Sequence, residues 1–137
     1  MNIRPSTKVD LEQCENIFNL PELADVSGDK LSAGYLEGFL DGKYFLVAEK
    51  DNKILGAIYG EPIRTGGIMI WSLAILNDYK GKGIGHKLLE KFEKNAVDDN
   101  KKWIILHAPA ESDAVVDFYK KHHYDIGNKF IECAKDL

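Results

Sequence analysis

The segment Tyr79–Leu89 constrains this chain more than any other part of its sequence. It reads YKGKGIGHKLL: three glycines alternate with other residues, lysines flank them, and an amphipathic helical pattern follows. Glycine adopts positive φ angles and lets a ligand approach the backbone closely. The start of a helix presents unpaired N–H groups and the positive end of the helix dipole. Together these features predict a phosphate-binding site, and therefore a phosphorylated cofactor, where a strand leads into a helix.

Two common phosphate-binding motifs do not fit this segment. The dinucleotide motif GxGxxG, started at Gly81, requires a glycine where the chain has His86. The motif GxxxxGK[ST] requires a Gly-Lys-Ser or Gly-Lys-Thr triplet, which the sequence lacks. A nucleotide-binding module of either kind is therefore the least favoured interpretation.

Composition sets the broad class of protein. A chain of 137 residues, 45% of them hydrophobic, is long and apolar enough for one domain with a real core, so we expect a single domain over residues 1–137. The net charge of −4 does not favour nucleic acid as a partner. We expect no membrane span, no signal peptide and no metal site, since Cys14 and Cys133 stand far apart without a CxxC pair. A reduced, cytoplasmic protein is the resulting expectation.

Hydrophobic periodicity predicts six strands and four helices. The predicted strands are Asn2–Arg4, Tyr44–Glu49, Ile54–Ile63, Ile68–Leu76, Trp103–His107 and Ile126–Ala134, and the predicted helices are Val9–Phe18, Leu31–Leu40, Ile84–Val97 and a last one from Ser112 or Asp113 to His122. Asp51-Asn52 predicts a hairpin turn, Gly42 a helix end, and Asn19–Lys30 a loop. This order indicates an α/β (α+β) fold with a mixed sheet and helices on both faces.

Three segments carry a resemblance to a known family. Lys80–Gly85 resembles the acyl-CoA loop of the GNAT (Gcn5-related) N-acetyltransferases, whose pattern is Gln/Arg-x-x-Gly-x-Gly/Ala, with Lys80 in the place of Gln/Arg. Trp71–Leu76 looks like the family's fourth strand, and Asp117–Tyr124 looks like its late helix, with His123-Tyr124 replacing the usual Gly-Phe. The resemblance implies the GNAT fold, with a central sheet of about six to seven strands and about four helices, and acetyl-CoA as the cosubstrate.

The resemblance also implies the residues that would bind acetyl-CoA. Backbone N–H groups of the loop would hold the pyrophosphate, from Lys80, Gly81, Lys82, Gly83, Ile84, Gly85 and His86. Backbone groups of the preceding strand, Leu73, Ala74 and Ile75, would pair with the pantetheine arm as a strand pairs with a peptide. Ser112 would help to position CoA, or it is a plain helix cap.

For catalysis, the resemblance assigns Tyr119 as the general acid that protonates the departing thiolate, although a tyrosine in that apolar stripe could equally belong to the core. Two residues are candidates for the general base. His107 lies twelve positions before Tyr119, where the ribosomal-protein alanine acetyltransferases carry a glutamate, and Glu61 lies near the end of the third strand. The two rank equally on sequence alone.

The acceptor is the least constrained feature. Between Asp10 and Asp41 there are eight acidic residues against one base, Lys30, which favours a positively charged amine, either a small molecule or an amine of a peptide or protein. The same acids would also serve simply to solvate helix faces. A non-catalytic acyl-CoA-binding sensor or assembly module is the alternative to an enzyme. A homodimer that pairs or packs through Ile126–Ala134 is a further prediction.

Overall fold

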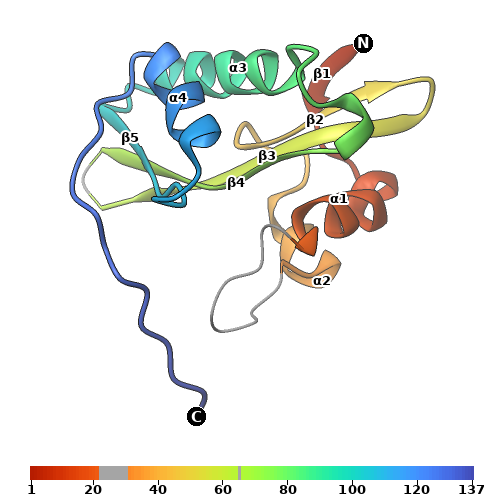
Figure 1. Cartoon of the computed structure of the whole chain (residues 1–137). Helices are drawn as coiled ribbons and strands as arrows, with labels where there is room; N and C mark the ends of the chain where they lie inside the picture. The colour runs from red at the N-terminus through yellow and green to blue at the C-terminus, as the bar shows by residue number, and fades with distance from the viewer. Residues whose placement is uncertain (22–30, 65) are drawn as a thin grey trace.

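One mixed β-sheet forms the centre of the molecule (Figure 1). The computed structural model describes residues 1–21, 31–64 and 66–137. The strands follow one another in the sheet in chain order, and only the last pair, β4 and β5, runs parallel. They are β1 (Asn2–Pro5), β2 (Phe45–Lys50), β3 (Lys53–Ile63), β4 (Gly67–Ile75) and β5 (Trp103–Leu106).

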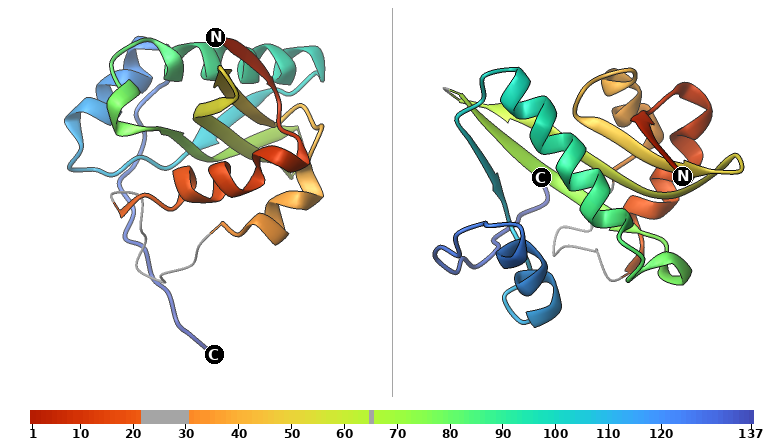
Figure 2. Two further views of the ribbon diagram at one scale, coloured as in Figure 1. Left: turned by 90° about the vertical axis from the view of Figure 1, so that its right-hand side faces the viewer. Right: turned by 90° about the horizontal axis from the view of Figure 1, so that it is seen from above.

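Helices cover both faces of this sheet, as predicted (Figures 1 and 2). The α-helices are α1 (Leu11–Phe18), α2 (Ala33–Leu36), α3 (Ile84–Asp98) and α4 (Asp113–Lys121), and the short 3-10 helices are η1 (Lys8–Asp10), η3 (Glu37–Phe39) and η4 (Asn77–Tyr79). α3 and α4 lie on one face, and α1 and α2 lie on the other. None of the helices in the described ranges is long and apolar enough to cross a membrane.

Two apolar clusters hold the layers together. The first joins the α3 stripe to the sheet, and all five residues predicted for that stripe are buried: Ile84, Leu88, Leu89, Phe92 and Ala96. The second packs α1 and Leu36 of α2 against the opposite face. Burying a large aliphatic or aromatic side chain contributes roughly 1.5–3 kcal/mol, so both clusters stabilise the packing of the helices on the sheet.

Local turn chemistry agrees with the sequence at two places. Asp51 and Asn52, which join β2 to β3, both have positive φ angles of 52° and 63°, as a type I′ hairpin turn requires. α4 ends with His123 at a φ of 66°, and the Tyr124 N–H donates to the Tyr119 carbonyl at 3.0 Å. His123, which stands where the family usually has glycine, therefore closes the helix in the left-handed conformation.

Three predictions about local structure are wrong. Ile126–Ala134 forms no strand, because it has no neighbouring strand to pair with, so the described sheet has five strands rather than six or seven. The helix predicted over Leu31–Leu40 is shorter and changes from α2 to η3, where Gly34 and Gly38 weaken it. The left-handed residue after it is Asp41, with a φ of 56°, rather than Gly42.

Most of the predicted loop Asn19–Lys30, namely residues 22–30, lies outside the described residues, as does Thr65 between the predicted third and fourth strands. Figure 1 shows the C-terminal tail running past β5 and away from the body of the molecule. Its apolar side chains Ile126, Phe130 and Ile131 are exposed. The homodimer through this tail stays a prediction.

Candidate active site

The sheet opens between β4 and β5. These strands pair only from Gly67 with Trp103 to Ile70 with Leu106, although β4 continues to Ile75. Trp71 is the extra residue of a β-bulge opposite β3, because Tyr59 pairs with Ser72 and Gly60 with Ile70. Beyond Ile70, therefore, one edge of β4 faces no strand in the described part of the chain.

The residues of β4 that hydrogen-bond to β3 alternate with residues whose backbone groups point into this opening. The Leu76 N–H donates to the Leu55 carbonyl at 2.9 Å, and bonding residues alternate along an antiparallel ladder. Ala74 and Ser72 therefore bond toward β3, whereas the N–H and C=O groups of Leu73 and Ile75 point to the open edge. Leu73 and Ile75 are two of the three strand residues that the sequence analysis selected for pairing with an extended ligand, and the third, Ala74, bonds toward β3 instead.

The glycine loop follows directly after this open edge. Gly81 and Gly83 have φ angles of 74° and 80°, and Gly83 is the N-cap of α3 without a side-chain capping bond. No acidic residue occupies the first turn of the helix. The N–H groups of Ile84, Gly85 and His86 thus begin the helix without an internal acceptor, which is the arrangement that binds phosphate.

The space in front of the loop is open. A Cβ atom built on Gly81 or Gly83 would meet no described atom within 4 Å. Protein packing therefore does not require glycine at these positions, although their positive φ angles do favour it. The described structure therefore leaves this side of the loop backbone open.

Lysines gather around Tyr79, next to the loop. Lys82 Nζ lies 5.2 Å from the centre of the Tyr79 ring, and Lys53 Nζ lies 4.9 Å from it and 3.4 Å from the hydroxyl. Lys53 begins β3 and was not singled out in the sequence, because only the fold brings it beside the loop. Lys80 and Lys87 are exposed on the same segment. The local charge thus favours an anion, although the whole chain is acidic.

α4 packs against the start of α3 and places Tyr119 in the α3-side cluster. Phe118 lies over Gly85, where a Cβ would be 3.6 Å from the phenyl ring. Tyr119 is buried in the same cluster as Leu73 and Ile75. Burial raises the pKa of Tyr119 to about 12, so its hydroxyl stays protonated near neutral pH. Such a group can donate a proton or a hydrogen bond, as a general acid must.

Glu61 lies on the opposite face of the sheet. Tyr35 donates a hydrogen bond to its Oε2 atom at 3.1 Å, and the Tyr35 and Tyr59 hydroxyls lie 3.5 Å apart. Burial, followed by hydrogen bonds to Glu61 and Tyr35, raises the pKa of Tyr59 well above its usual value. Glu61 is therefore part of a polar cluster that joins α2 to β3 rather than a simple strand-end residue.

His107 follows β5 at the point where the sheet opens. Ile104 and Leu106 pack in the α3-side cluster, so strand alternation directs Ile105 and His107 to the face of Glu61. The His107 ring is exposed and lies 6.1 Å from that of Phe130. The base candidates thus lie on one face of the sheet and Tyr119 on the other, with the open edge of β4 between them.

Two further predicted residues, His86 and Ser112, lie at the starts of α3 and α4. His86 Nδ1 lies 3.0 Å from His122 Nε2, and His86 Nε2 lies 2.9 Å from Glu90, so this side chain turns toward α4. Ser112 is the N-cap residue of α4, but its hydroxyl makes no capping bond. Among the described residues, no group of three or more potential metal ligands is found.

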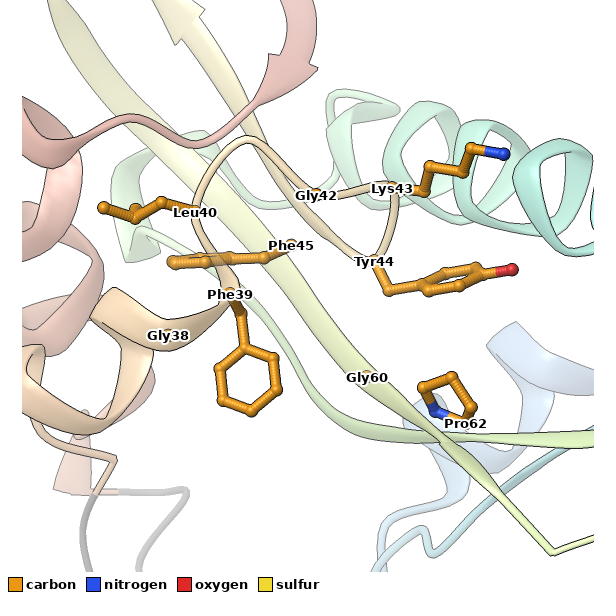
Figure 3. Close-up of a pocket in the computed structure, with 9 residues that line it drawn as sticks. All are labelled: Gly38, Phe39, Leu40, Gly42, Lys43, Tyr44, Phe45, Gly60 and Pro62. Atoms are coloured by element: carbon orange, nitrogen blue, oxygen red, sulfur yellow. The ribbon is translucent and has the colours of Figure 1, made fainter.

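A recess of about 230 Å³ lies beside β3 (Figure 3). It is lined by apolar groups of η3, the start of β2 and β3, including Phe39, Phe45 and Pro62. Phe39 also contacts the Tyr59 ring, with centroids 5.2 Å apart. The recess therefore adjoins the Glu61 cluster rather than the glycine loop.

The sequence matches the model of the acetyltransferase (GNAT) family over residues 11–124. The chain belongs to the GNAT acetyltransferase family. A GNAT relative, an acetyltransferase of Sodalis glossinidius, is 30% identical over 97 residues, which is 71% of this chain and 68% of that protein.

Solved GNAT structures share the fold. Ard1 of Thermoplasma volcanium superimposes with a TM-score of 0.80 at 20% identity, over 93% of this chain and 84% of that one. An aminoglycoside N-acetyltransferase solved in complex with CoA gives a TM-score of 0.77 at 12% identity, over 99% and 95% of the two chains. The GNAT fold expected from the sequence is confirmed.

Proposed function

We propose that this protein is an acetyl-CoA-dependent N-acetyltransferase that modifies a primary amine by direct attack within a ternary complex. The observation that carries the proposal is the alignment of the open β4 edge with the uncapped start of α3. An extended arm that ends in a pyrophosphate needs these two features in this order. A similar fold that was solved with CoA supports the assignment.

The binding roles follow from the backbone. Leu73 and Ile75 would pair with the amide groups of the arm, and one of their N–H groups would polarise the thioester carbonyl. Ile84, Gly85 and His86 would donate N–H groups to the pyrophosphate, with Lys53 and Lys82 nearby. Acetyl-CoA supplies the activated acetyl group.

Tyr119 is proposed as the general acid and His107 as the general base. The register supports His107 over Glu61 for the base. Glu61 on β3 pairs with Met69 on β4, and Met69 pairs with Ile105 on β5. Glu61 therefore lies one strand away from the open edge, at a level where β4 and β5 are still paired. His107 directly follows Leu106, the last residue of β5 that pairs with β4. A base at that position faces an amine that approaches the edge from the α1 side.

Calorimetric titration with acetyl-CoA, with NAD and ATP as controls, tests the cofactor assignment. We expect selective binding of acetyl-CoA that is lost in Gly83→Trp, because the indole would fill the space in front of the loop. Gly127→Trp is the matched control, since a Cβ on Gly127 also meets no described atom within 4 Å but lies in the tail.

The outcomes separate the two functional classes. Binding of acetyl-CoA together with acetylation of at least one amine in a broad panel supports the enzyme. Binding with no turnover above background would instead favour a non-catalytic acyl-CoA module. Unchanged binding in a folded Gly83→Trp variant would contradict the loop assignment.

A further inference from the structure

Three aromatic rings and one carboxylate form a compact cluster on the α1 side of the sheet. Tyr35 comes from α2, Phe39 from η3, and Tyr59 and Glu61 from β3. The ring centroids of Tyr35 and Phe39 lie 5.4 Å apart, those of Phe39 and Tyr59 5.2 Å, and those of Tyr35 and Tyr59 6.4 Å. Tyr35 is 50% exposed, so solvent reaches one side of the cluster.

We propose that this cluster binds a second, non-reacting cationic group of the acceptor, so that the preferred acceptors are organic diamines or polyamines. The proposal rests on the proposed acetyltransferase function. It assigns Glu61 to binding of the acceptor, and it leaves the deprotonation of the reacting amine to His107.

The chemistry of the cluster suits an alkylammonium group. Aromatic faces attract a cation through their quadrupole, and a carboxylate adds a charged hydrogen-bond acceptor. The Tyr35 hydroxyl, 3.1 Å from Oε2, fixes the orientation of the carboxylate without neutralising it. No lysine or arginine pairs with Glu61 among the ion pairs of the described residues. The described neighbours of this carboxylate are thus the hydroxyl groups of Tyr35 and Tyr59.

The acidic stretch noted in the sequence is a weaker candidate for this role. Asp10 pairs with Arg4, Glu15 accepts the Ala33 N–H, and Glu37 lies 3.7 Å from Lys8 Nζ. Protein groups therefore already engage these three acids. The carboxylate that faces the aromatic cluster comes from β3, outside that stretch.

The register gives the span that such an acceptor must bridge. Glu61, Met69 and Ile105 are neighbours across β3, β4 and β5. Adjacent strands lie about 4.8 Å apart, so about 10 Å separates β3 from the line of β5, where His107 follows. An acceptor with two amines about this far apart could place one at the open edge and the other at Glu61.

The test compares a linear diamine with a nitrogen–nitrogen span of about 10 Å, as estimated from strand spacing, with the monoamine of the same chain length. For each, kcat/KM is measured in wild type, Glu61→Gln, Phe39→Leu and Glu12→Gln. Glu12→Gln is the matched control, because Glu12 is exposed on α1 of the same side and the change in net charge is identical.

We expect the ratio of kcat/KM for the diamine to kcat/KM for the monoamine to be roughly ten in wild type. Glu61→Gln should bring this ratio close to one. Phe39→Leu should lower the ratio by about threefold through loss of a ring face. Glu12→Gln should keep the wild-type ratio. A wild-type ratio near one, or a ratio that survives Glu61→Gln, overturns the proposal. Equal loss with both amines in Glu61→Gln also overturns it, because that result makes Glu61 the base.

Calorimetric titration of the diamine into the CoA-saturated protein separates this proposal from the proposed function. Binding that Glu61→Gln weakens by roughly tenfold, in a protein that acetylates no amine, would keep the cation site and contradict the enzyme. If the protein acetylates amines but Glu61→Gln binds the diamine as tightly as wild type does, the enzyme function would be kept and the cation site contradicted.

Discussion

Tyr119 illustrates at the scale of one residue how burial can prepare a side chain for chemistry. It is 8% exposed and packs edge-on against Phe118 and Tyr124, with ring centroids 5.1 and 5.4 Å away. The resulting pKa of about 12 keeps the phenol neutral across the neutral and mildly alkaline range. The residue type and its helix follow from the sequence, but its place in the same apolar cluster as Leu73 and Ile75 follows only from the fold.

Tyr119→Phe should lower kcat by about 10²-fold, the lower range for loss of a general acid, and should change the affinity for acetyl-CoA by less than about twofold. Steady-state kinetics and calorimetry on the same preparation measure both quantities. Tyr124→Phe, which removes a neighbouring phenol from the same cluster, is the control. Unchanged turnover in Tyr119→Phe would remove this residue from the acid role.

Glu61 marks the limit of residue-scale prediction. Its position near the end of a strand is evident in the sequence, but its partners are not. Tyr35 is 26 positions away from Glu61, and Tyr59 is 24 positions away from Tyr35. The cluster exists only because α2 packs onto β3, and no local pattern records that contact.

Among the secondary-structure elements, β3 and β4 are fitted to each other through glycine. A Cβ on Gly60 would lie 2.4 Å from the Met69 carbonyl oxygen and 2.6 Å from the Phe92 ring. Gly60 adjoins the bulge that contains Trp71, at the level where the sheet begins to open. This close packing is part of what positions the open edge.

Gly60→Ala should therefore lower the free energy of unfolding by about 2 kcal/mol, within the usual range for overpacking. Gly38→Ala is the matched control, because a Cβ there meets no described atom within 4 Å and alanine restricts the unfolded chain. Urea denaturation of the two variants measures the difference. Equal stability of the two would show that β3 and β4 adjust freely at this point.

Elements with strong internal signals were predictable, and elements that depend on a partner were not. α3 carries its whole buried stripe in sequence, and the β2–β3 turn is encoded by two residues. Ile126–Ala134 has the composition of a strand, yet a strand needs a neighbour to pair with, and the tail has none in the described structure.

At the scale of the whole molecule, an ion pair ties the first strand to the first helices. Arg4 donates to the two oxygens of Asp10 at 2.7 and 2.9 Å, and the Thr7 N–H donates at 2.7 Å. Burial alone would raise the pKa of Asp10, but the hydrogen bonds from Arg4 and Thr7 outweigh it and hold this pKa below its usual value.

Asp10→Asn should lower the free energy of unfolding by about 2 kcal/mol at neutral pH, because Arg4 loses the closer of its two carboxylate partners and keeps only Glu49, at 3.3 Å. The pKa of Asp10 is lower in the folded state than in the unfolded chain, where it is about 4. The ionised carboxylate therefore stabilises the folded protein at pH values above about 4, and this contribution is lost as the pH falls through the folded-state pKa. When the melting temperature is measured over a series of acidic pH values, we expect it to fall less steeply with decreasing pH in Asp10→Asn than in wild type. Asp117→Asn, an exposed change on α4, is the control and should keep the wild-type dependence of the melting temperature on pH. The same pH dependence in all three proteins would contradict the role assigned to Asp10.

Because β5 ends its pairing with β4 at Ile70, the stability of the fold can depend on a ligand that the cell supplies. The free protein carries a sheet with one edge left incomplete beyond Ile70. A chain-like ligand paired along that edge would bind the folded state and not the unfolded chain, so its stabilisation of the fold would grow with the logarithm of its concentration above the Kd. Under the proposed function, the supply of acetyl-CoA would thus set how long the protein survives against unfolding and proteolysis, in addition to setting its rate of turnover.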